Sequence, residues 1–236
     1  EIFHNFTLLH DDIMDDAPIR RGRPSVFKNW NQNIAILSGD TMFALAMKYI
    51  ADSPVNVVKD IMEEFSSTAI EVCEGQQYDL EFESRQDVSI EEYIEMIRLK
   101  TAVLLACSVK SGAIIAEADM ILQDTIYEYG LNLGLAFQLK DDLLDTYGNE
   151  EIFGKKCGND IITNKKTYLL VKAMELANEE QKNEILFLLN QNQLPEKEKI
   201  RRMLKVFDPL QIETEPEHTI QDYYLKSHNI LKERII

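Results

Sequence analysis

Apolar residues recur every three or four positions along most of the chain, which is the spacing of one face of an α-helix. Ser89 followed by Glu92 forms a capping box and marks the start of one such helix. A sustained alternation of period two, the signature of a strand, does not occur. The expected helices span 3–14, 34–51, 55–82, 89–118, 121–147, 166–178, 180–191, 196–207 and 217–236. The pattern predicts an all-α protein with one domain over residues 1–236.

Two loops rich in charge or glycine interrupt the helices. Residues 18–24 hold three arginines and a glycine between two prolines, which ends the first helix. Residues 148–163 hold three glycines and follow helix 121–147, which is apolar on nearly all its faces. We expect that helix at the centre of a bundle, with Gly130 and Gly134 admitting another helix at close range.

Charge and composition narrow the function. The 236 residues carry 25 Lys and Arg against 41 Asp and Glu, a net charge of −16 that opposes binding to nucleic acid or anionic membranes. No uninterrupted apolar run approaches the roughly 18 residues of a membrane span, so we expect none. Three cysteines without ligand spacing indicate reduced thiols in a cytoplasmic protein. Because the sequence begins without Met inside a helical pattern, we expect that N-terminal helices are missing from it.

Two aspartate clusters of spacing D-D-x-x-D stand in apolar helical segments. They comprise Asp11, Asp12 and Asp15, and Asp141, Asp142 and Asp145. The first and last aspartates of each cluster are four residues apart and share one helix face. A solvated acidic face is the alternative interpretation, but carboxylates among apolar neighbours are costly unless cations neutralise them. Because only oxygen donors are offered, Mg²⁺ is the expected ion.

Basic residues follow both clusters, at Arg20, Arg21, Lys155, Lys156, Lys165 and Lys166. Taken singly they are ordinary surface charges, but beside carboxylates in an acidic protein they indicate phosphate binding. Mg²⁺ keeps coordination positions for water and for substrate phosphate oxygens. Two facing clusters that hold several Mg²⁺ ions therefore predict a diphosphate substrate.

The order of these motifs resembles that of the trans-isoprenyl diphosphate synthases, the short-chain polyprenyl synthetases. His4, the first aspartate cluster and the run from Arg20 to Pro24 resemble the first aspartate-rich region of that family. The family's second aspartate-rich region has counterparts in Phe137, Gln138, the second cluster, Gly154, Lys155, Gly158, Asp160, Lys165 and Thr167, which resemble it in type and order. The resemblance implies an isoprenoid synthase-type helical bundle around a central cavity. The family's upstream Gly-Gly-Lys-Arg-type segment, which helps bind isopentenyl diphosphate, has no counterpart before Glu1.

The resemblance also implies residue roles. The six aspartates would bind three Mg²⁺ ions per active site, with Asp11, Asp15 and Asp141 as ligands. The other three, Asp12, Asp142 and Asp145, would be further ligands or hydrogen-bonding partners of ligands. Catalytic groups that stabilise the departing diphosphate or an allylic cation would be Lys100, Thr101, Gln138 and Lys155. Substrate diphosphates would be held by His4, Arg20, Arg21 and Lys165.

The implied reaction condenses isopentenyl diphosphate with an allylic diphosphate to give a trans-prenyl diphosphate, in a protein expected to be a homodimer. Phe6 and Thr7 lie five and four residues before Asp11, beside the path of a growing prenyl chain. In such enzymes an aromatic residue at this depth limits elongation, which predicts a C15 to C20 product with C20 favoured. The alternative is that Phe6 is an ordinary core residue.

Three other functions fit part of the pattern. A terpene cyclase shares the first aspartate motif, but its second motif mixes Asn or Asp with Ser or Thr and Glu. A non-catalytic partner subunit of a prenyl synthase would explain the absent upstream cations, although intact aspartate motifs argue against it. A di-iron bundle needs paired Glu-x-x-His elements, and the match of Glu215 with His218 is interrupted by Pro216.

Overall fold

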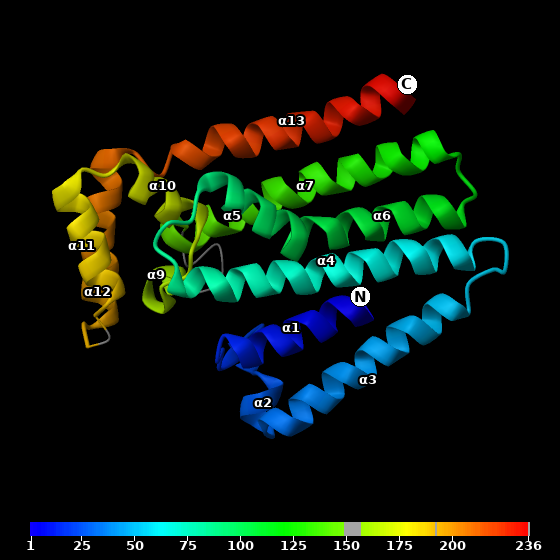
Figure 1. Cartoon of the computed structure of the whole chain (residues 1–236), viewed down its shortest axis with the longest axis horizontal. Helices are drawn as coiled ribbons and strands as arrows, with labels where there is room; N and C mark the ends of the chain where they lie inside the picture. The colour runs from blue at the N-terminus through cyan, green and yellow to red at the C-terminus, as the bar shows by residue number, and fades with distance from the viewer. Residues whose placement is uncertain (149–156, 192, 236) are drawn as a thin grey trace. The chain divides into compact units, whose positions relative to one another are not determined.

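The computed structural model describes residues 1–148, 157–191 and 193–235, and these residues are almost entirely helical, as the apolar spacing predicts (Figure 1). They form two compact units, Glu1–Ser66 and Ser67–Ile236. Helix α4, Val58–Ser84, contributes residues to both units. The single domain expected over residues 1–236 stays a prediction.

The first unit is built on the packing of helix α1 against helix α3. Its elements are α1 Ile2–Met14, β1 Ile19–Arg20, β2 Arg23–Pro24, α2 Val26–Asn29 and α3 Gln32–Ala51. Strands β1 and β2 pair antiparallel within the loop predicted at 18–24, with Ile19 opposite Pro24. The sequence pattern did not predict this hairpin because strands of two residues are too short to show an alternation.

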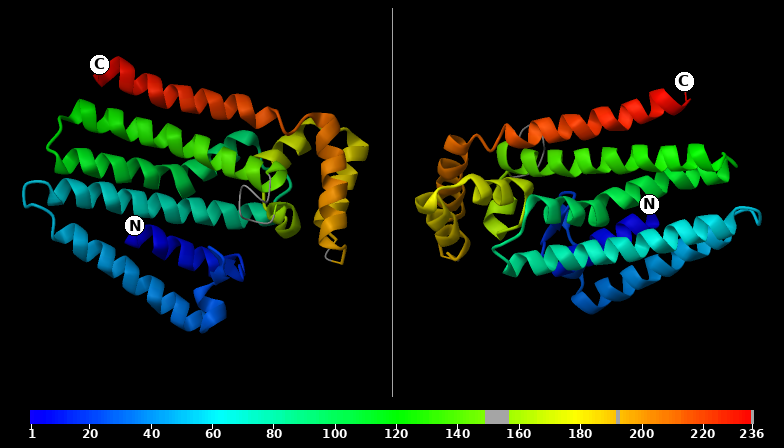
Figure 2. Two further views of the ribbon diagram at one scale, coloured as in Figure 1. Left: turned by 180° about the vertical axis from the view of Figure 1, so that it is seen from behind. Right: turned by 45° about the horizontal axis from the view of Figure 1, so that its top comes forward.

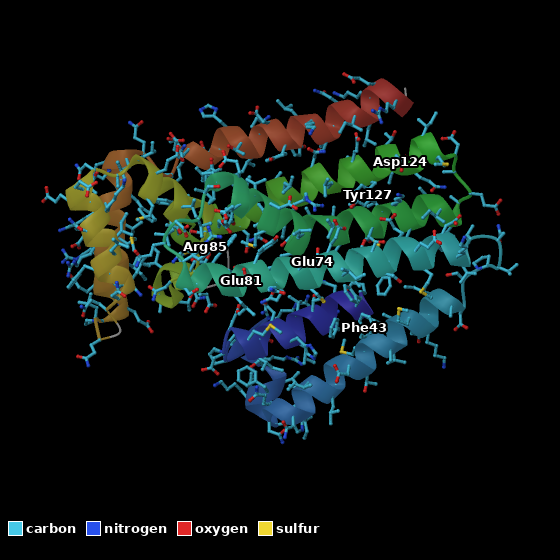
Figure 3. The ribbon with its side chains drawn as sticks, viewed as in Figure 1. Phe43, Glu74, Glu81, Arg85, Asp124 and Tyr127 are labelled. Carbon is cyan, nitrogen blue, oxygen red and sulfur yellow. The ribbon has the colours of Figure 1, made fainter. Side chains whose placement is uncertain are left out.

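Four phenylalanines hold the helices of the first unit together. The ring centroid of Phe3 lies 5.4 Å from that of Phe6, 5.8 Å from Phe43 and 4.9 Å from Phe65. Figure 3 labels Phe43 on α3. Aromatic pairs at such distances contribute about 0.5–1.5 kcal/mol each beyond their burial. Aromatic packing therefore anchors α1 directly before the aspartates that it carries.

Helix α3 bears on the expectation that the chain has no membrane span, which stays a prediction. In the part of the chain that the structure describes, α3 alone is long and apolar enough to cross a membrane by length and composition, with 17% of its apolar window buried. Asp40 and Lys48 interrupt the apolar run of this helix, so the sequence pattern did not indicate a span. Core helices and signal sequences pass the same test, so one such helix is weak evidence for a span.

In the second unit, helix α7 lies between helices α6 and α13 (Figure 2). The elements after α4 are α5 Ile90–Ile97, the π-helical segment η1 Arg98–Ala102, α6 Val103–Ile115, α7 Met120–Tyr147, α9 Asn159–Thr163, α10 Tyr168–Leu176, α11 Glu179–Leu189, α12 Glu196–Phe207, the 3₁₀ turn η2 Asp208–Leu210 and α13 Glu215–Ile235. The capping box predicted at Ser89 and Glu92 is confirmed at the start of α5. The helix predicted over 89–118 is divided by η1, and the loop predicted over 148–163 contains α9.

Close approach of α7 to its neighbours depends on two glycines, as predicted. A Cβ atom on Gly130 would lie 2.7 Å from the Cα of Ala106, and one on Gly134 would lie 2.6 Å from the Cα of Ala102. Both distances are shorter than any ordinary carbon–carbon contact. Helix α7 therefore packs against η1 and α6 with its backbone, which fixes the position of the second aspartate motif near its C-terminal end.

Replacing Gly134 with alanine is expected to lower the free energy of unfolding by about 1–3 kcal/mol, because the backbones of α7 and η1 must separate. Gly112 on α6 provides the matched control, since a Cβ atom there meets nothing within 4 Å. Gly112→Ala should raise the free energy of unfolding by about 0.5–1 kcal/mol through helix propensity alone. Urea denaturation followed by circular dichroism measures both changes, and shifts of equal sign would contradict the packing argument.

Candidate active site

The first aspartate motif ends helix α1. Asp12 is buried, and its Oδ1 lies 2.8 Å from Nε and 2.6 Å from Nη2 of Arg20. The same guanidinium lies 3.4 Å from Oδ2 of Asp11. Asp15 is the C-cap of the helix and is exposed. Arg20, which we predicted to bind substrate, thus neutralises the buried Asp12, while Asp11 and Asp15 lie one helical turn apart.

The hairpin after α1 turns at Arg21 and Gly22. Their φ angles are +53° and +73°, so both central residues of the turn are left-handed, as a type I′ hairpin requires. Glycine accepts this conformation without steric cost. Partial burial lowers the pKa of His4, and the charges of Arg21 and Arg20 lower it further against the opposing effect of Glu1. The structure therefore places His4 close enough to Arg20 and Arg21 for their charges to lower its pKa. All three residues are predicted to hold substrate diphosphates.

His10 supports the first motif through a helix contact that the sequence interpretation missed. Its Nε2 lies 3.2 Å from the carbonyl oxygen of Ile36 on α3. A Cβ atom on Gly39 would lie 2.2 Å from the same nitrogen, so the imidazole occupies space that only glycine leaves open. His10 thus joins α1 to α3 one residue before Asp11. The position of a histidine directly before the aspartate motif was the available signal.

Phe6 and Thr7, the predicted chain-length residues, both have partners within the first unit. The ring of Phe6 lies 4.7 Å from that of His10 and 5.4 Å from that of Phe43. The hydroxyl of Thr7 donates to the carbonyl oxygen of His4 at 2.8 Å. Phe6 is half-buried against these rings, and its effect on chain length stays a prediction.

The second aspartate motif contains a deeply buried carboxylate. Asp142 is 3% exposed, and its Oδ2 accepts hydrogen bonds from the Tyr93 hydroxyl and, at 3.0 Å, from the backbone N–H of Tyr168. Its Oδ1 accepts from Nε2 of Gln138 at 3.1 Å. Burial raises the pKa of Asp142 to about 6, although these three donors lower it. The carboxylate therefore joins α5, α7 and the start of α10, and Tyr93 is a partner that the sequence did not predict.

Asp145 connects the motif to the short helix α9. Its Oδ2 accepts the backbone N–H of Asp160 at 2.9 Å. Burial raises the pKa of Asp160 to about 7. The charge of Lys165 lowers this pKa, and the negative charges of Asp145, Asp142 and Asp141 raise it. The structure thus gathers Asp160 and the predicted substrate-binding Lys165 with the second motif. Asp160 stood in the resembled motif, but we had assigned it no role.

Two further predicted catalytic residues are ordered by partners on other helices. Lys100 lies in the π-helical segment η1, and its Nζ is 2.5 Å from Oδ2 of the buried Asp79 on α4. The hydroxyl of Thr101 donates to Oε1 of Gln138 at 3.0 Å. Because π-helical turns occur frequently at functional sites, this local geometry agrees with a catalytic role. Asp79 was missed, since it lies 21 residues before Lys100.

Lys155, the remaining predicted catalytic residue, lies outside the described residues, as do Gly154 and Lys156. Thr167 caps α10 by accepting the N–H of Leu170 at 3.3 Å, which is a structural role.

Within the described residues, no group of three or more His, Cys, Asp or Glu side chains is arranged to hold a metal ion alone. Each unit instead offers two carboxylates one helical turn apart, Asp11 with Asp15 and Asp141 with Asp145. Mg²⁺ is usually bound by one or two carboxylates, with waters and substrate phosphates completing its octahedron. The donor set therefore fits Mg²⁺ that is shared with a phosphorylated substrate.

Comparisons with known proteins identify the family and the fold of the chain. The polyprenyl synthetase family model matches residues 1–207. The short chain isoprenyl diphosphate synthase of Methanothermobacter thermautotrophicus is 42% identical over 190 residues, which cover 80% of this chain and 58% of that protein. The chain spans between about half and two thirds of the length of the first curated relatives that it matches.

Solved structures are similar over almost the whole chain. A crystal structure of geranylgeranyl pyrophosphate synthase superposes with a TM-score of 0.92 at 44% identity, over 98% of this chain and 72% of that one. The geranylgeranyl pyrophosphate synthase of Corynebacterium glutamicum, complexed with isoprenyl diphosphate and magnesium, has a TM-score of 0.88 at 28% identity, over 98% and 70%. These matches confirm the all-α isoprenoid synthase fold. The chain belongs to the polyprenyl synthetase family.

Proposed function

We propose that the protein is a Mg²⁺-dependent prenyltransferase that condenses isopentenyl diphosphate with an allylic diphosphate. The observation that carries the proposal is the pair of helix-borne carboxylates in each unit, with a buried aspartate between them that is held by Arg20 or by Tyr93. Membership of the polyprenyl synthetase family supports it. The expected product is a trans-prenyl diphosphate of C15 to C20, with C20 favoured by similarity to geranylgeranyl pyrophosphate synthases.

In this proposal Asp11, Asp15, Asp141 and Asp145 hold three Mg²⁺ ions together with the substrate diphosphate. When bound, Mg²⁺ supplies positive charge that stabilises the negative charge of the departing diphosphate. Asp12 and Asp142 act as supports, because donors already meet Oδ1 of Asp12 and both carboxylate oxygens of Asp142. Of the two roles that the resemblance left open for these residues, the geometry favours the hydrogen-bonding partner over the direct ligand.

Ionisation of the allylic substrate breaks its C–O bond, and the electron pair leaves with the diphosphate. Lys100 and Lys155 would bind the developing negative charge, with Asp79 holding the Lys100 ammonium in place. The oxygens of Thr101 and Gln138, ordered by their mutual hydrogen bond, would offer negative dipole ends to the allylic cation. Apolar side chains would exclude water from the cation.

Isopentenyl diphosphate, bound by His4 and Arg21, would then supply the electron pair of its double bond to the allylic cation. This step forms the new carbon–carbon bond and moves the positive charge onto the isopentenyl unit. Loss of a proton to the departed diphosphate restores a double bond and completes the five-carbon extension. The base in this step is the departed diphosphate, so the protein's part in it is to hold the two diphosphates in register.

Product analysis of the complete protein tests the proposal. Labelled isopentenyl diphosphate and Mg²⁺ are supplied with dimethylallyl, geranyl or farnesyl diphosphate, and labelled C15 to C20 diphosphates are expected. Removal of Mg²⁺ with EDTA should abolish them. Hydrocarbon formed from one allylic diphosphate alone would identify a terpene cyclase, and no product from any primer would identify a non-catalytic subunit. Homodimerisation and a cytoplasmic location are also part of the proposal, which sedimentation and cell fractionation can test.

Phe6→Ala is expected to lengthen the products by one or more five-carbon units, because the side chain at this depth would limit the growing chain. The loss of its contacts with Phe3 and Phe43 should also destabilise the first unit by about 3 kcal/mol. Chromatography of dephosphorylated products measures the chain length. An unchanged product profile at a temperature where the variant stays folded would leave Phe6 as a core residue only.

A further inference from the structure

Residues 157–167, which precede α10, present two of the candidate site residues, and their one helix is short. Helix α9 is five residues long and carries Asp160, and Lys165 follows it. Left-handed residues bound it on both sides, Gly158 with φ +83° and Asn164 with φ +62°. A single helical turn is unstable in isolation, since its few hydrogen bonds do not offset the lost chain entropy. Its position must therefore come from contacts with other elements.

Helix α12 supplies contacts at both ends of α9. At the first end, a Cβ atom on Gly158 would lie 2.6 Å from Cδ1 of Ile200, so the isoleucine packs directly on the glycine backbone. At the other end, Nζ of Lys199 lies 3.0 Å from the carbonyl oxygen of Ile162 and 2.6 Å from Oδ1 of Asn164. Lys199 and Ile200 are consecutive residues, so a single turn of α12 contacts both ends of α9.

Lys199 is an unusual lysine. It is 5% exposed, although lysine is almost never fully buried unless its charge is satisfied. Both acceptors that its Nζ meets are neutral oxygens, one of them at the C-terminal end of a helix, where a cation is favoured. Asn164 continues the connection, because its Nδ2 donates to the carbonyl oxygen of Leu189 on α11 at 3.1 Å. A buried cation is costly to keep, which indicates that its contacts serve the placement of α9.

We propose that Lys199 is a positioning residue that clamps the C-terminal end of α9, so that Asp160 stays hydrogen-bonded to Asp145 and Lys165 stays beside them. Lys199 itself contacts neither substrate nor metal in this scheme. It acts through Asn164 and Ile162, and its effect on catalysis rests on the proposed function. The effect of Lys199 on α9 does not rest on the proposed function, because it concerns only the hydrogen bond from the Asp160 N–H to Asp145.

Hydrogen exchange in the complete protein tests the clamp directly. Lys199→Met keeps the length of the side chain and removes both hydrogen bonds. We expect exchange of the Asp160 amide to accelerate about tenfold or more, while the amide of Leu139 in the core of α7 keeps its protection. Lys205→Met, an exposed lysine on the same helix, is the matched control and should change neither amide.

Two substitutions at Asn164 give an independent test if Lys199→Met folds poorly. Asn164→Gly retains the left-handed backbone and removes the acceptor, so it should reproduce the effect of Lys199→Met. Asn164→Asp keeps an oxygen for Lys199 but loses the donor to Leu189, so its Asp160 amide should exchange more slowly than that of Asn164→Gly. Unchanged exchange at Asp160 in both Lys199→Met and Asn164→Gly would overturn the clamp, as would an equal loss of protection at Asp160 and Leu139.

Kinetics then separates positioning from general stability. In variants that stay folded, Lys199→Met is expected to lower kcat about 10- to 100-fold, the usual effect of losing a partner that orients ligands. Lys205→Met should leave kcat unchanged. If the wild-type protein transfers no prenyl group, the proposed function fails, but the exchange rates of Asp160 still decide whether Lys199 holds α9.

Discussion

Replacing Asp15 with asparagine is expected to lower kcat for prenyl transfer by about 10²–10³-fold. One of two Mg²⁺ ligands on α1 would be lost, and with it charge stabilisation of the departing diphosphate. Because Asp15 is exposed at the C-cap of the helix, the substitution should change the free energy of unfolding by no more than about 0.5 kcal/mol. Steady-state kinetics over a range of Mg²⁺ concentrations measures the effect, and the Mg²⁺ requirement should rise.

The adjacent Asp16 is the control for this prediction. It is also exposed, it carries the same charge, and its carboxylate pairs with Lys28 at 2.8 Å. Its φ of +47° suits asparagine as well as aspartate, so Asp16→Asn removes a charge without backbone strain. We expect kcat for Asp16→Asn to equal that of the wild type. A similar loss in both variants would mean that general negative charge matters at this end of α1, and that ligand geometry does not.

The two aspartate motifs divide their residues in the same way. The second aspartate of each, Asp12 or Asp142, is buried at 4% or 3% exposure and accepts hydrogen bonds from its own unit. The first and last aspartates are less buried and share one helix face. A helix turns about 100° per residue, so the side chain next to a surface ligand points toward the interior. The spacing therefore encodes a pair of carboxylates with a buried carboxylate beside them, and their role as Mg²⁺ ligands and the convergence of the two pairs stay predictions.

The helices could be predicted from the sequence because helix formation is largely determined by residues close together in the chain. Apolar spacing and the cap at Ser89 depend on neighbours within one or two turns, and the structure confirms both. The π-helical segment η1 was not predicted, because its backbone is set by packing against Gly75 and Gly134 from other helices. Helix α9 was missed for a similar reason. It is held by Asp145 and Lys199, which are 15 and 37 residues away from their partners in it.

The supporting residues of the candidate site could not be read from the sequence either. Tyr93 lies 49 residues before Asp142, and a tyrosine on an apolar helix face is usually a core residue. Asp79 likewise resembles one more charge on α4 until its hydrogen bond with Lys100 is seen. A sequence motif identifies candidate site residues that lie close together in one segment of the chain. The donors that hold those residues are distributed over the fold, and only tertiary structure brings them together.

Asp142→Asn is expected to lower the free energy of unfolding by about 2–4 kcal/mol, even without Mg²⁺. The new amide Nδ2 must face a donor, either that of Gln138 or those of Tyr93 and Tyr168, and each buried donor left without an acceptor costs about 1–3 kcal/mol.

Asp124→Asn on the same helix is the matched control for Asp142→Asn. Its side chain, which Figure 3 labels on α7, is 63% exposed. Its Oδ1 lies 3.5 Å from Nζ of Lys110, so we expect a change within about 0.5 kcal/mol. Urea denaturation in EDTA at pH 8 measures both variants. A direct Mg²⁺ ligand would behave differently, because its loss would leave stability in EDTA unchanged and weaken only the stabilisation by added Mg²⁺. If Asp142→Asn behaved in this way, Asp142 would be a direct Mg²⁺ ligand, and Tyr93 would be one of several packing residues.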